Sequence, residues 1–380
     1  MTELIERPLS ASLALSKIFE MLQWVKTQLD KIGSPTLDWV QVEVTTHCNA
    51  ACVYCPHTLL KNRWTTKHMP LDLFYEFTPF LKYTNLVYLQ GWGEPLLNKD
   101  FFKMVRICKD RGKRVGFTTN GMLLSENTLR RLVDLGLDIL GISLAGTSAA
   151  AHDEIRKGTR LNEIVSHLDR LRKMKREKKT QVPAVHLAYL MLTSNFHQLE
   201  HIVAFAKSVG AKQIVASNLT LIIDPRLSSE AIFNDTGRMD HYRIALEEIK
   251  DSAAREDIVF DYHGPGLDEN RTRCRENVRH ACVINVQGDV GPCVFTNAVL
   301  AANRECPDGN CTYYTFKDRR LPIRAMSFGN IGHENLTRIW HKEQYIRFRK
   351  LFAPQVSKKP GAILAEMPEC CVSCYKRLGA

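Results

Sequence analysis

Short apolar runs alternate with amphipathic segments through the first half of the chain. Six runs rich in β-branched and aromatic residues predict buried strands at 39–45, 86–90, 114–119, 139–144, 184–193 and 213–217. Between them, apolar residues recur at helical spacing over 70–82, 99–111, 125–135, 161–178 and 196–209. Strands joined by helices of this length form parallel crossover units. The pattern therefore predicts an α/β fold, either a partial (β/α)6 TIM-like barrel or an open sheet.

Several helix ends carry local signals. Ser125 is a good N-cap residue for the helix that follows it. Gly112 and Gly210 come after two other predicted helices and suit the left-handed conformation that closes a helix. In barrels and open sheets alike, functional sites gather at the carboxyl ends of the strands. The segments directly after the predicted strands are therefore the first candidates for a site.

The composition and the hydrophobic pattern of the sequence change after residue 218. Residues 226–257 have the pattern of a polar helical bridge, and residues 258–380 are rich in Gly, Pro, Asn and Cys. Residues 1–37 contain an amphipathic pattern typical of one helix. We therefore predict four parts: an N-terminal helical segment (1–37), the α/β part (38–225), the helical bridge (226–257) and a small, loop-rich α+β domain (258–380).

Composition narrows the class of protein. The 380 residues are 44% hydrophobic and 24% charged, which excludes a disordered, collagen-like or coiled-coil chain. No apolar run approaches the roughly 20 residues that span a bilayer, and the N-terminus lacks the pattern of a secretory signal. We therefore predict a cytoplasmic protein. The chain has twelve cysteines. Cytosolic thiols stay reduced, so clustered cysteines there more often bind metal or do redox chemistry than form disulfides.

A first group of cysteines follows the first predicted strand. Cys48, Cys52 and Cys55 have the spacing CxxxCxxC. Three thiolates hold three irons of a 4Fe–4S cluster and leave the fourth iron open to another ligand. Zinc is the alternative, because His47 or His57 offers a fourth ligand.

This group resembles the radical S-adenosylmethionine (SAM) superfamily, in which an aromatic residue such as Tyr54 precedes the last cysteine. Three further segments match the superfamily in order. Residues 91–95 resemble its GGEP motif, residues 119–121 read Thr-Asn-Gly, and residues 141–156 resemble its "SLDG…HDxIRG" stretch. Two positions depart from the pattern. Trp92 replaces the first glycine of GGEP and predicts a bulkier pocket wall, and Ala145 replaces an aspartate, so no role is assigned there.

The resemblance implies a 4Fe–4S cluster on Cys48, Cys52 and Cys55 with SAM beside it. In the superfamily, residues at the positions of Gly93 and Glu94 hold the methionine amino group, the serine at Ser143 contacts the ribose, and the arginine at Arg156 contacts the carboxylate. The SAM-pocket residues expected here are Tyr54, Gly93, Glu94, Asn120, Ser143 and Arg156. A carboxylate, a guanidinium, a hydroxyl and an aromatic ring suit the four parts of SAM.

A second group of cysteines lies near the C-terminus. Cys274 and Cys293 flank Gly288 in the spacing Cx₁₃GxxxxC, and residues 370–374 read Cys-Cys-x-x-Cys. Together with residues 328–340, which resemble "GNI…LxxIW", they resemble the SPASM and twitch extensions of radical SAM enzymes. The resemblance implies an auxiliary 4Fe–4S cluster on Cys274, Cys293, Cys371 and Cys374.

Other ligand sets remain open. Cys282 is an alternative to Cys274, and Cys370 is an alternative to Cys371. Cys306 and Cys311 flank a loop and would add ligands if there were a second auxiliary cluster. The CxxCx₅CxxxC block of domains with two auxiliary clusters is absent, so we predict one auxiliary cluster.

By resemblance, the enzyme cleaves SAM reductively to a 5′-deoxyadenosyl radical and abstracts hydrogen from a small-molecule or peptidyl substrate. We expect an oxidation or rearrangement, with an electron donor such as flavodoxin or ferredoxin. The alternatives are an RNA-modifying enzyme, a peptide maturase and a non-catalytic iron–sulfur scaffold. The N-terminal segment is too short for a leader-binding domain, which argues against peptide maturation through a leader reader in the same chain but not through a separate reader protein. No catalytic acid or base is assigned.

The net charge of +11 is compatible with a nucleic acid, an acidic membrane or an anionic substrate. Three cysteinyl ligands leave an oxidised cubane at about −1 and four at about −2, so part of the basic excess offsets cluster charge. Aromatic residues do not gather near the basic runs, as they would in a single-strand binding surface. We therefore expect neither a nucleic acid nor a membrane as partner.

The number of clusters is measurable by iron and sulfide analysis of the anaerobically reconstituted chain. We expect about eight irons per chain, because two 4Fe–4S clusters each hold four. A content of about twelve would indicate two auxiliary clusters, and about four would contradict an auxiliary cluster.

Overall fold

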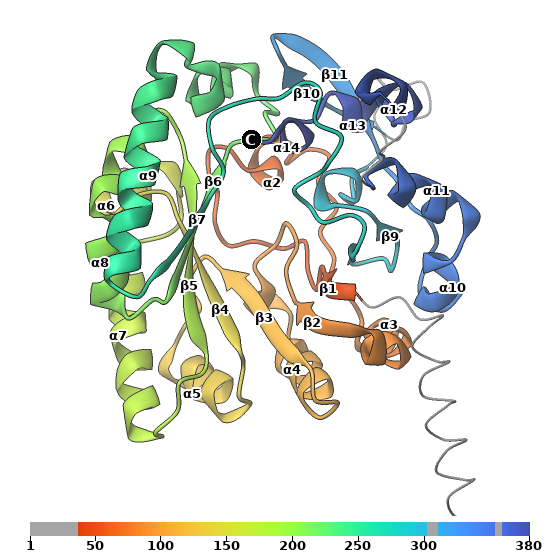
Figure 1. Ribbon diagram of the computed structural model, residues 1–380. Helices are drawn as coiled ribbons and strands as arrows, with labels where there is room; N and C mark the ends of the chain where they lie inside the picture. The colour runs from red at the N-terminus through yellow and green to blue at the C-terminus, as the bar shows by residue number, and fades with distance from the viewer. Residues whose placement is uncertain (1–36, 302–310, 354–358) are drawn as a thin grey trace, which may run out of the picture. The chain divides into compact units, whose positions relative to one another are not determined.

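The computed structural model describes residues 37–301, 311–353 and 359–380 (Figure 1). The predicted N-terminal helix and Cys306 lie outside these ranges. A nine-stranded sheet runs in the order β7-β6-β5-β4-β3-β2-β1-β8-β9. Its strands are β1 (Leu37–Val42), β2 (Thr84–Tyr88), β3 (Arg114–Thr119), β4 (Ile139–Leu144), β5 (Ala184–Met191), β6 (Gln213–Asn218), β7 (Val259–Tyr262), β8 (Ala281–Ile284) and β9 (Val290–Gly291).

Strands β1 to β7 pair in parallel with their neighbours in the sheet, which confirms the predicted α/β class. All six predicted strands are present, with ends shifted by three residues at most. Parallel pairing brings the carboxyl ends of successive strands to one edge. The segments that follow β1, β2, β3 and β4 therefore meet there, as their sequence positions predicted.

Helices connect these strands and cover the sheet. They are α2 (Pro56–Leu59), α3 (Leu71–Phe77), α4 (Phe101–Lys109), α5 (Glu126–Asp134), α6 (Ala149–Ile155), α7 (Leu161–Glu177), α8 (Ile202–Val209) and α9 (Met239–Arg255). Figure 1 shows α7, α8 and α9 along the outer side of the sheet. In α7, Leu161, Ile164, Leu168 and Leu171 are buried at helical spacing. Burying one such side chain contributes about 1.5–3 kcal/mol, so this stripe fixes which face of α7 meets the sheet.

The predicted helix ends agree with the structure. The Ser125 hydroxyl accepts a hydrogen bond from the Thr128 amide at 3.2 Å and caps α5. Gly210 closes α8 with φ of +71°. Two predicted helices are only partly α-helical. The predicted helix 70–82 continues from α3 as a 3₁₀ helix over Thr78–Tyr83, because Pro79 lacks the amide hydrogen that an α-helix needs. Residues Phe196–His201 form a 3₁₀ turn before α8.

The C-terminal region adds short helices and strands that were not predicted. It contains the hairpin β10 (Cys311–Phe316) and β11 (Arg319–Arg324), and the helices α10 (Leu336–Trp340), α11 (Glu343–Leu351), α12 (Pro360–Glu366), α13 (Glu369–Val372) and α14 (Tyr375–Leu378). β7 pairs with β6, and β8 pairs in parallel with β1. Residues 258–380 therefore supply strands to both sides of the main sheet.

Leu37–Ala380 form one compact unit. One sheet contains strands from both sides of the predicted boundaries at residues 225 and 257. The sheet therefore marks neither boundary, and both remain predictions. In the part of the chain that the structure describes, no helix is long and apolar enough to cross a membrane.

Candidate functional site

The first cysteine group lies on the segment between β1 and α2. This segment pairs with the C-terminal end of α6 and the residues after it: the Ala51 amide donates to the Lys157 carbonyl at 2.7 Å, and the Val53 amide donates to the Ile155 carbonyl at 3.0 Å. Gly158 has φ of +86°, and a Cβ there would lie 3.2 Å from the Ala50 Cα. The backbone thus holds the cysteine segment against the end of α6.

The three thiols of this group interact electrostatically with one another. Burial raises the pKa of Cys55 to about 12 and is also the main cause of the raised pKa of Cys48. Within the described ranges, no three His, Cys, Asp or Glu side chains are placed to hold a single metal ion. Each sulfur of a cubane site binds a different iron, and metal binding would convert these thiols to thiolates.

Arg156 places a buried cation beside the cysteines. It follows α6 directly, and only 8% of its surface is exposed. Its guanidinium donates to the Tyr54 hydroxyl and interacts with all three thiols. Its Nε is buried and has no hydrogen-bond partner. A buried donor without a partner is costly, so this nitrogen fits an anionic ligand such as a carboxylate.

Glu94 supplies a buried carboxylate on the segment after β2. It accepts hydrogen bonds from the Thr119 hydroxyl and the Asn120 amide, each at 2.8 Å. Desolvation raises its pKa to about 7. Gly93 lies where a Cβ would come within 2.5 Å of the Thr45 and His47 carbonyl oxygens, so this approach requires glycine. A buried carboxylate of this kind fits a cationic group such as the SAM ammonium.

The structure brings most of the predicted SAM-pocket residues together. Tyr54 contacts Arg156, and Glu94 contacts Asn120 and interacts electrostatically with Arg156. The Asn120 side chain also donates to the Asn49 side chain at 2.7 Å, which links the end of β3 to the cysteine segment. Ser143 is half-buried on β4. None of these interactions joins its side chain to the other pocket residues.

The second cysteine group surrounds a small cavity in the C-terminal region. Cys274, Cys293, Cys371 and Cys374 line it, and so does Cys370. Burial raises the pKa of Cys293 to about 11 and that of Cys274 further. Because Cys370 and Cys371 both reach this cavity, the choice between them stays open.

The remaining cysteines lie elsewhere. Cys282 is buried on β8 among core residues, and the cavity lining does not include it. Cys311 forms a disulfide, and Cys108 is buried in the core on α4. Of the described alternatives to the four predicted ligands, only Cys370 therefore shares their cavity.

Charged side chains accompany the second group. Lys376 pairs with Glu276 and interacts electrostatically with Cys293 and Cys374. Arg377 donates to the carbonyls of Val372, Glu269 and Arg271. A partly buried ammonium that interacts with two of these cysteines suits a ligand set that is anionic when deprotonated.

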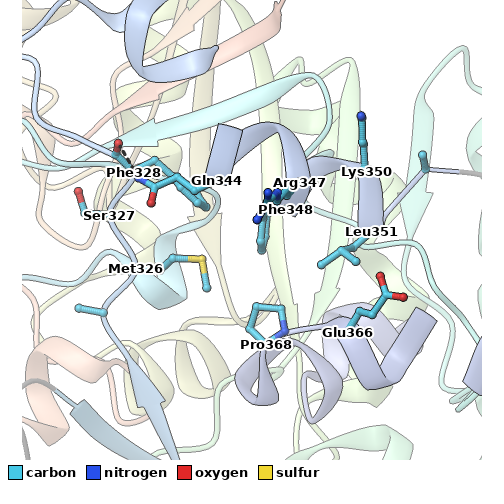
Figure 2. Close-up of a pocket in the computed structure, with 12 residues that line it drawn as sticks. Met326, Ser327, Phe328, Gln344, Arg347, Phe348, Lys350, Leu351, Glu366 and Pro368 are labelled. Atoms are coloured by element: carbon cyan, nitrogen blue, oxygen red, sulfur yellow. Dashed lines mark hydrogen bonds between the residues drawn. The ribbon is translucent and has the colours of Figure 1, made fainter. Parts of the chain in front are cut away.

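A wide surface hollow of about 960 Å³ contains none of the predicted site residues. Figure 2 shows Gln344, Arg347, Phe348 and Leu351 of α11 along it, with Met326 and Pro368 nearby. Phe348 also lines the cavity of the second cysteine group. Phe348 therefore separates the hollow from that cavity, and none of the first cysteine group lines the hollow.

Sequence reasoning missed two residues that join the cysteine groups, Glu43 and Trp92. The Trp92 indole Nε1 donates to the Val294 carbonyl at 3.2 Å, and the ring stacks on Phe295. Glu43 accepts hydrogen bonds from the amides of Trp92 and Val286. The tryptophan in place of a glycine in the GGEP-like motif was the sequence signal that could have pointed to this connection. The sequence alone does not show which way its side chain points.

Family models match two regions of the chain. The model of the radical SAM superfamily matches residues 42–206, and that of the SPASM iron–sulfur cluster-binding domain matches residues 274–375. These matches cover both cysteine groups and the predicted SAM pocket.

Among curated proteins, the tungsten-containing aldehyde ferredoxin oxidoreductase cofactor-modifying protein of Pyrococcus furiosus is 28% identical over 322 residues, which cover 82% of this chain and 83% of that protein. A probable GTP 3′,8-cyclase of Sulfurisphaera tokodaii is 29% identical over 188 residues, 49% of this chain and 57% of that protein.

Solved structures share the fold at low identity. Streptococcus suis SuiB bound to S-adenosylmethionine superposes with a TM-score of 0.62 at 14% identity, covering 95% of this chain and 77% of SuiB. anSMEcpe with bound AdoMet superposes with a TM-score of 0.57 at 14% identity, covering 89% and 88%. With family models matching residues 42–206 and 274–375, the chain belongs to the radical SAM superfamily: it is an enzyme that uses SAM and a 4Fe–4S cluster, and it carries an auxiliary cluster in a C-terminal SPASM domain.

Proposed function

We propose that this enzyme modifies an organic cofactor of an oxidoreductase, by hydrogen abstraction followed by one-electron oxidation. The similarity to the Pyrococcus furiosus cofactor-modifying protein, which spans most of both chains, supports the substrate class. The structural observation that supports the reaction type is the contact between the segments that bear the two sites. Trp92, on the segment of the first site, hydrogen-bonds and stacks on residues that directly follow Cys293 of the second.

The first site is proposed to bind its cofactors through the residues described above. Cys48, Cys52 and Cys55 would ligate the cluster, Glu94 would hold the SAM ammonium and Arg156 its carboxylate. Tyr54, Gly93, Asn120 and Ser143 would complete the pocket. When bound, SAM and the cluster supply a 5′-deoxyadenosyl radical that removes a hydrogen atom from the substrate. The buried Glu94 and Arg156 exclude water and orient the ligand by opposite charges.

The second site is proposed to take up the electron that an oxidation releases. Loss of a hydrogen atom leaves a substrate radical, and loss of one further electron and one proton gives a product with a new double bond. An acceptor for that electron is required within reach. Cys274, Cys293, Cys371 and Cys374 are the proposed ligands of that acceptor, and Lys376 stabilises added negative charge there.

Two further features remain predictions from the sequence. The electron that starts SAM cleavage would come from a donor such as flavodoxin or ferredoxin. The location would be the cytoplasm, where such donors and reduced thiols occur.

Cys52→Ala is expected to abolish reductive SAM cleavage, because two thiolates do not hold the site-differentiated cluster. The measurement is 5′-deoxyadenosine formation under dithionite, after anaerobic reconstitution. Cys108→Ala is the matched control, because Cys108 is a buried core cysteine outside both groups, and it should keep cleavage. Cleavage at the wild-type rate in Cys52→Ala would refute the ligand assignment.

SAM affinity is expected to rise with pH through about 7. Glu94 is protonated below its pKa of about 7, and only the carboxylate attracts the SAM ammonium. The dissociation constant at pH 6 should therefore be about tenfold larger than at pH 8. Equilibrium binding with the cluster content checked at each pH measures this, and Glu94→Gln should flatten the profile. An equally steep profile in Glu94→Gln would exclude Glu94 as its source.

The substrate class is testable by anaerobic incubation with SAM, reductant and fractionated cell extract. We expect substrate-dependent 5′-deoxyadenosine with the small-molecule fraction, together with a product that has lost two hydrogens by mass spectrometry. Turnover with the peptide fraction alone would favour a peptide maturase, and turnover with RNA alone would favour an RNA-modifying enzyme. Either result would overturn the proposed cofactor substrate.

A further inference from the structure

We propose that Trp92 is a positioning residue that makes SAM binding depend on the auxiliary cluster, an inference that rests on the ligand assignments proposed above. A glycine at this motif position, as in the superfamily pattern, has no side chain to reach the second site. In this chain, the indole of Trp92 connects the two sites.

At its SAM-facing side, Trp92 has little freedom. The next residue, Gly93, lies against the Thr45 and His47 carbonyl oxygens, where a Cβ would approach within 2.5 Å. The Glu94 amide then donates to the His47 carbonyl at 2.8 Å, and the Glu94 carboxylate is held by Thr119 and Asn120. A shift of the Trp92 backbone is therefore transmitted to Glu94.

At the other side, the indole reaches the auxiliary site. It donates to the Val294 carbonyl at 3.2 Å and stacks on Phe295, with ring centroids 6.2 Å apart and planes 18° apart. Phe295 lines the cavity of the second cysteine group, and the Lys376 ammonium lies 4.3 Å from its ring centroid. One indole thus connects the SAM segment to the residues that follow Cys293.

A second contact runs parallel to the first. The Glu43 carboxylate accepts from the Trp92 amide at 2.9 Å and from the Val286 amide, between β8 and β9, at 3.4 Å. Glu43 is buried, and a Cβ on Gly91 would lie 2.1 Å from its Cγ. The Trp92 backbone is thus tied to the SPASM region as well, so its side chain and main chain respond to the same neighbour.

The coupling follows from this geometry. Cluster ligation fixes Cys293 and thereby Val294 and Phe295, these fix the indole, and the indole fixes the backbone that presents Glu94. If the auxiliary site holds no cluster, Val294 and Phe295 no longer fix the Trp92 indole, and the backbone that presents Glu94 loses that contact. Linkage then requires the reciprocal effect, so SAM binding also stabilises the auxiliary site.

The test is a double-mutant cycle on SAM affinity, measured anaerobically by equilibrium binding without substrate. Cys374→Ser, with the first cluster verified by iron content, is expected to weaken SAM binding about tenfold in the Trp92 background. In the Trp92→Gly background the same change should weaken it less than about twofold, because the connection is already absent. Trp92→Phe, which keeps a ring to stack on Phe295, should restore part of the coupling.

A second cycle keeps every cysteine, in case Cys374→Ser does not fold. Phe295→Leu and Trp92→Gly should each weaken SAM binding about fivefold. The double variant should bind SAM no more weakly than the single variant with the lower affinity. The auxiliary-cluster EPR signal should change on SAM addition in the wild type and not in Trp92→Gly. Additive effects on affinity together with an unchanged EPR response would overturn the coupling. Absence of SAM binding to the wild type would instead refute the SAM-site assignment.

Discussion

The buried guanidinium of Arg156 is the constraint on which the site depends. A cation removed from water is costly unless anions or hydrogen-bond acceptors surround it. Here it directly follows α6, next to backbone hydrogen bonds that hold the cysteine segment, and it interacts with Tyr54 and three thiols. Its buried Nε has no hydrogen-bond acceptor. The same charge that would stabilise thiolates thus also favours an anionic ligand beside them.

The parallel sheet makes this arrangement possible. Glu94, Asn120 and Arg156 lie far apart in sequence, yet each follows the carboxyl end of a strand or the helix after it. The register of β1 to β4 brings these ends together. The SPASM region does not merely follow this sheet: β8 pairs with β1, the strand that leads into the cysteine segment. The two cysteine groups are therefore held by one continuous framework.

Periodicity and spacing predicted much of this. The strands were found because buried parallel strands are near-continuous apolar runs, and Ser125 was found because its hydroxyl caps a helix. β7 and β8 were missed because four-residue strands carry too little periodicity. Spacing could not choose between Cys274 and Cys282. In the structure, Cys274 lines the cavity, whereas Cys282 faces the core from a strand. Cys370 and Cys371 are adjacent and both reach the cavity, so neither sequence nor fold separates them.

The direction of the Trp92 side chain depends on tertiary contacts that no local pattern encodes.

The most direct test of the central claim, that Arg156 and Glu94 orient SAM on the cluster of Cys48, Cys52 and Cys55, is electron–nuclear double resonance on the reduced enzyme. With SAM isotope-labelled in its amino and carboxylate groups, we expect hyperfine coupling from both labels to the first cluster. Coupling from neither label, in protein shown to bind SAM, would contradict the account.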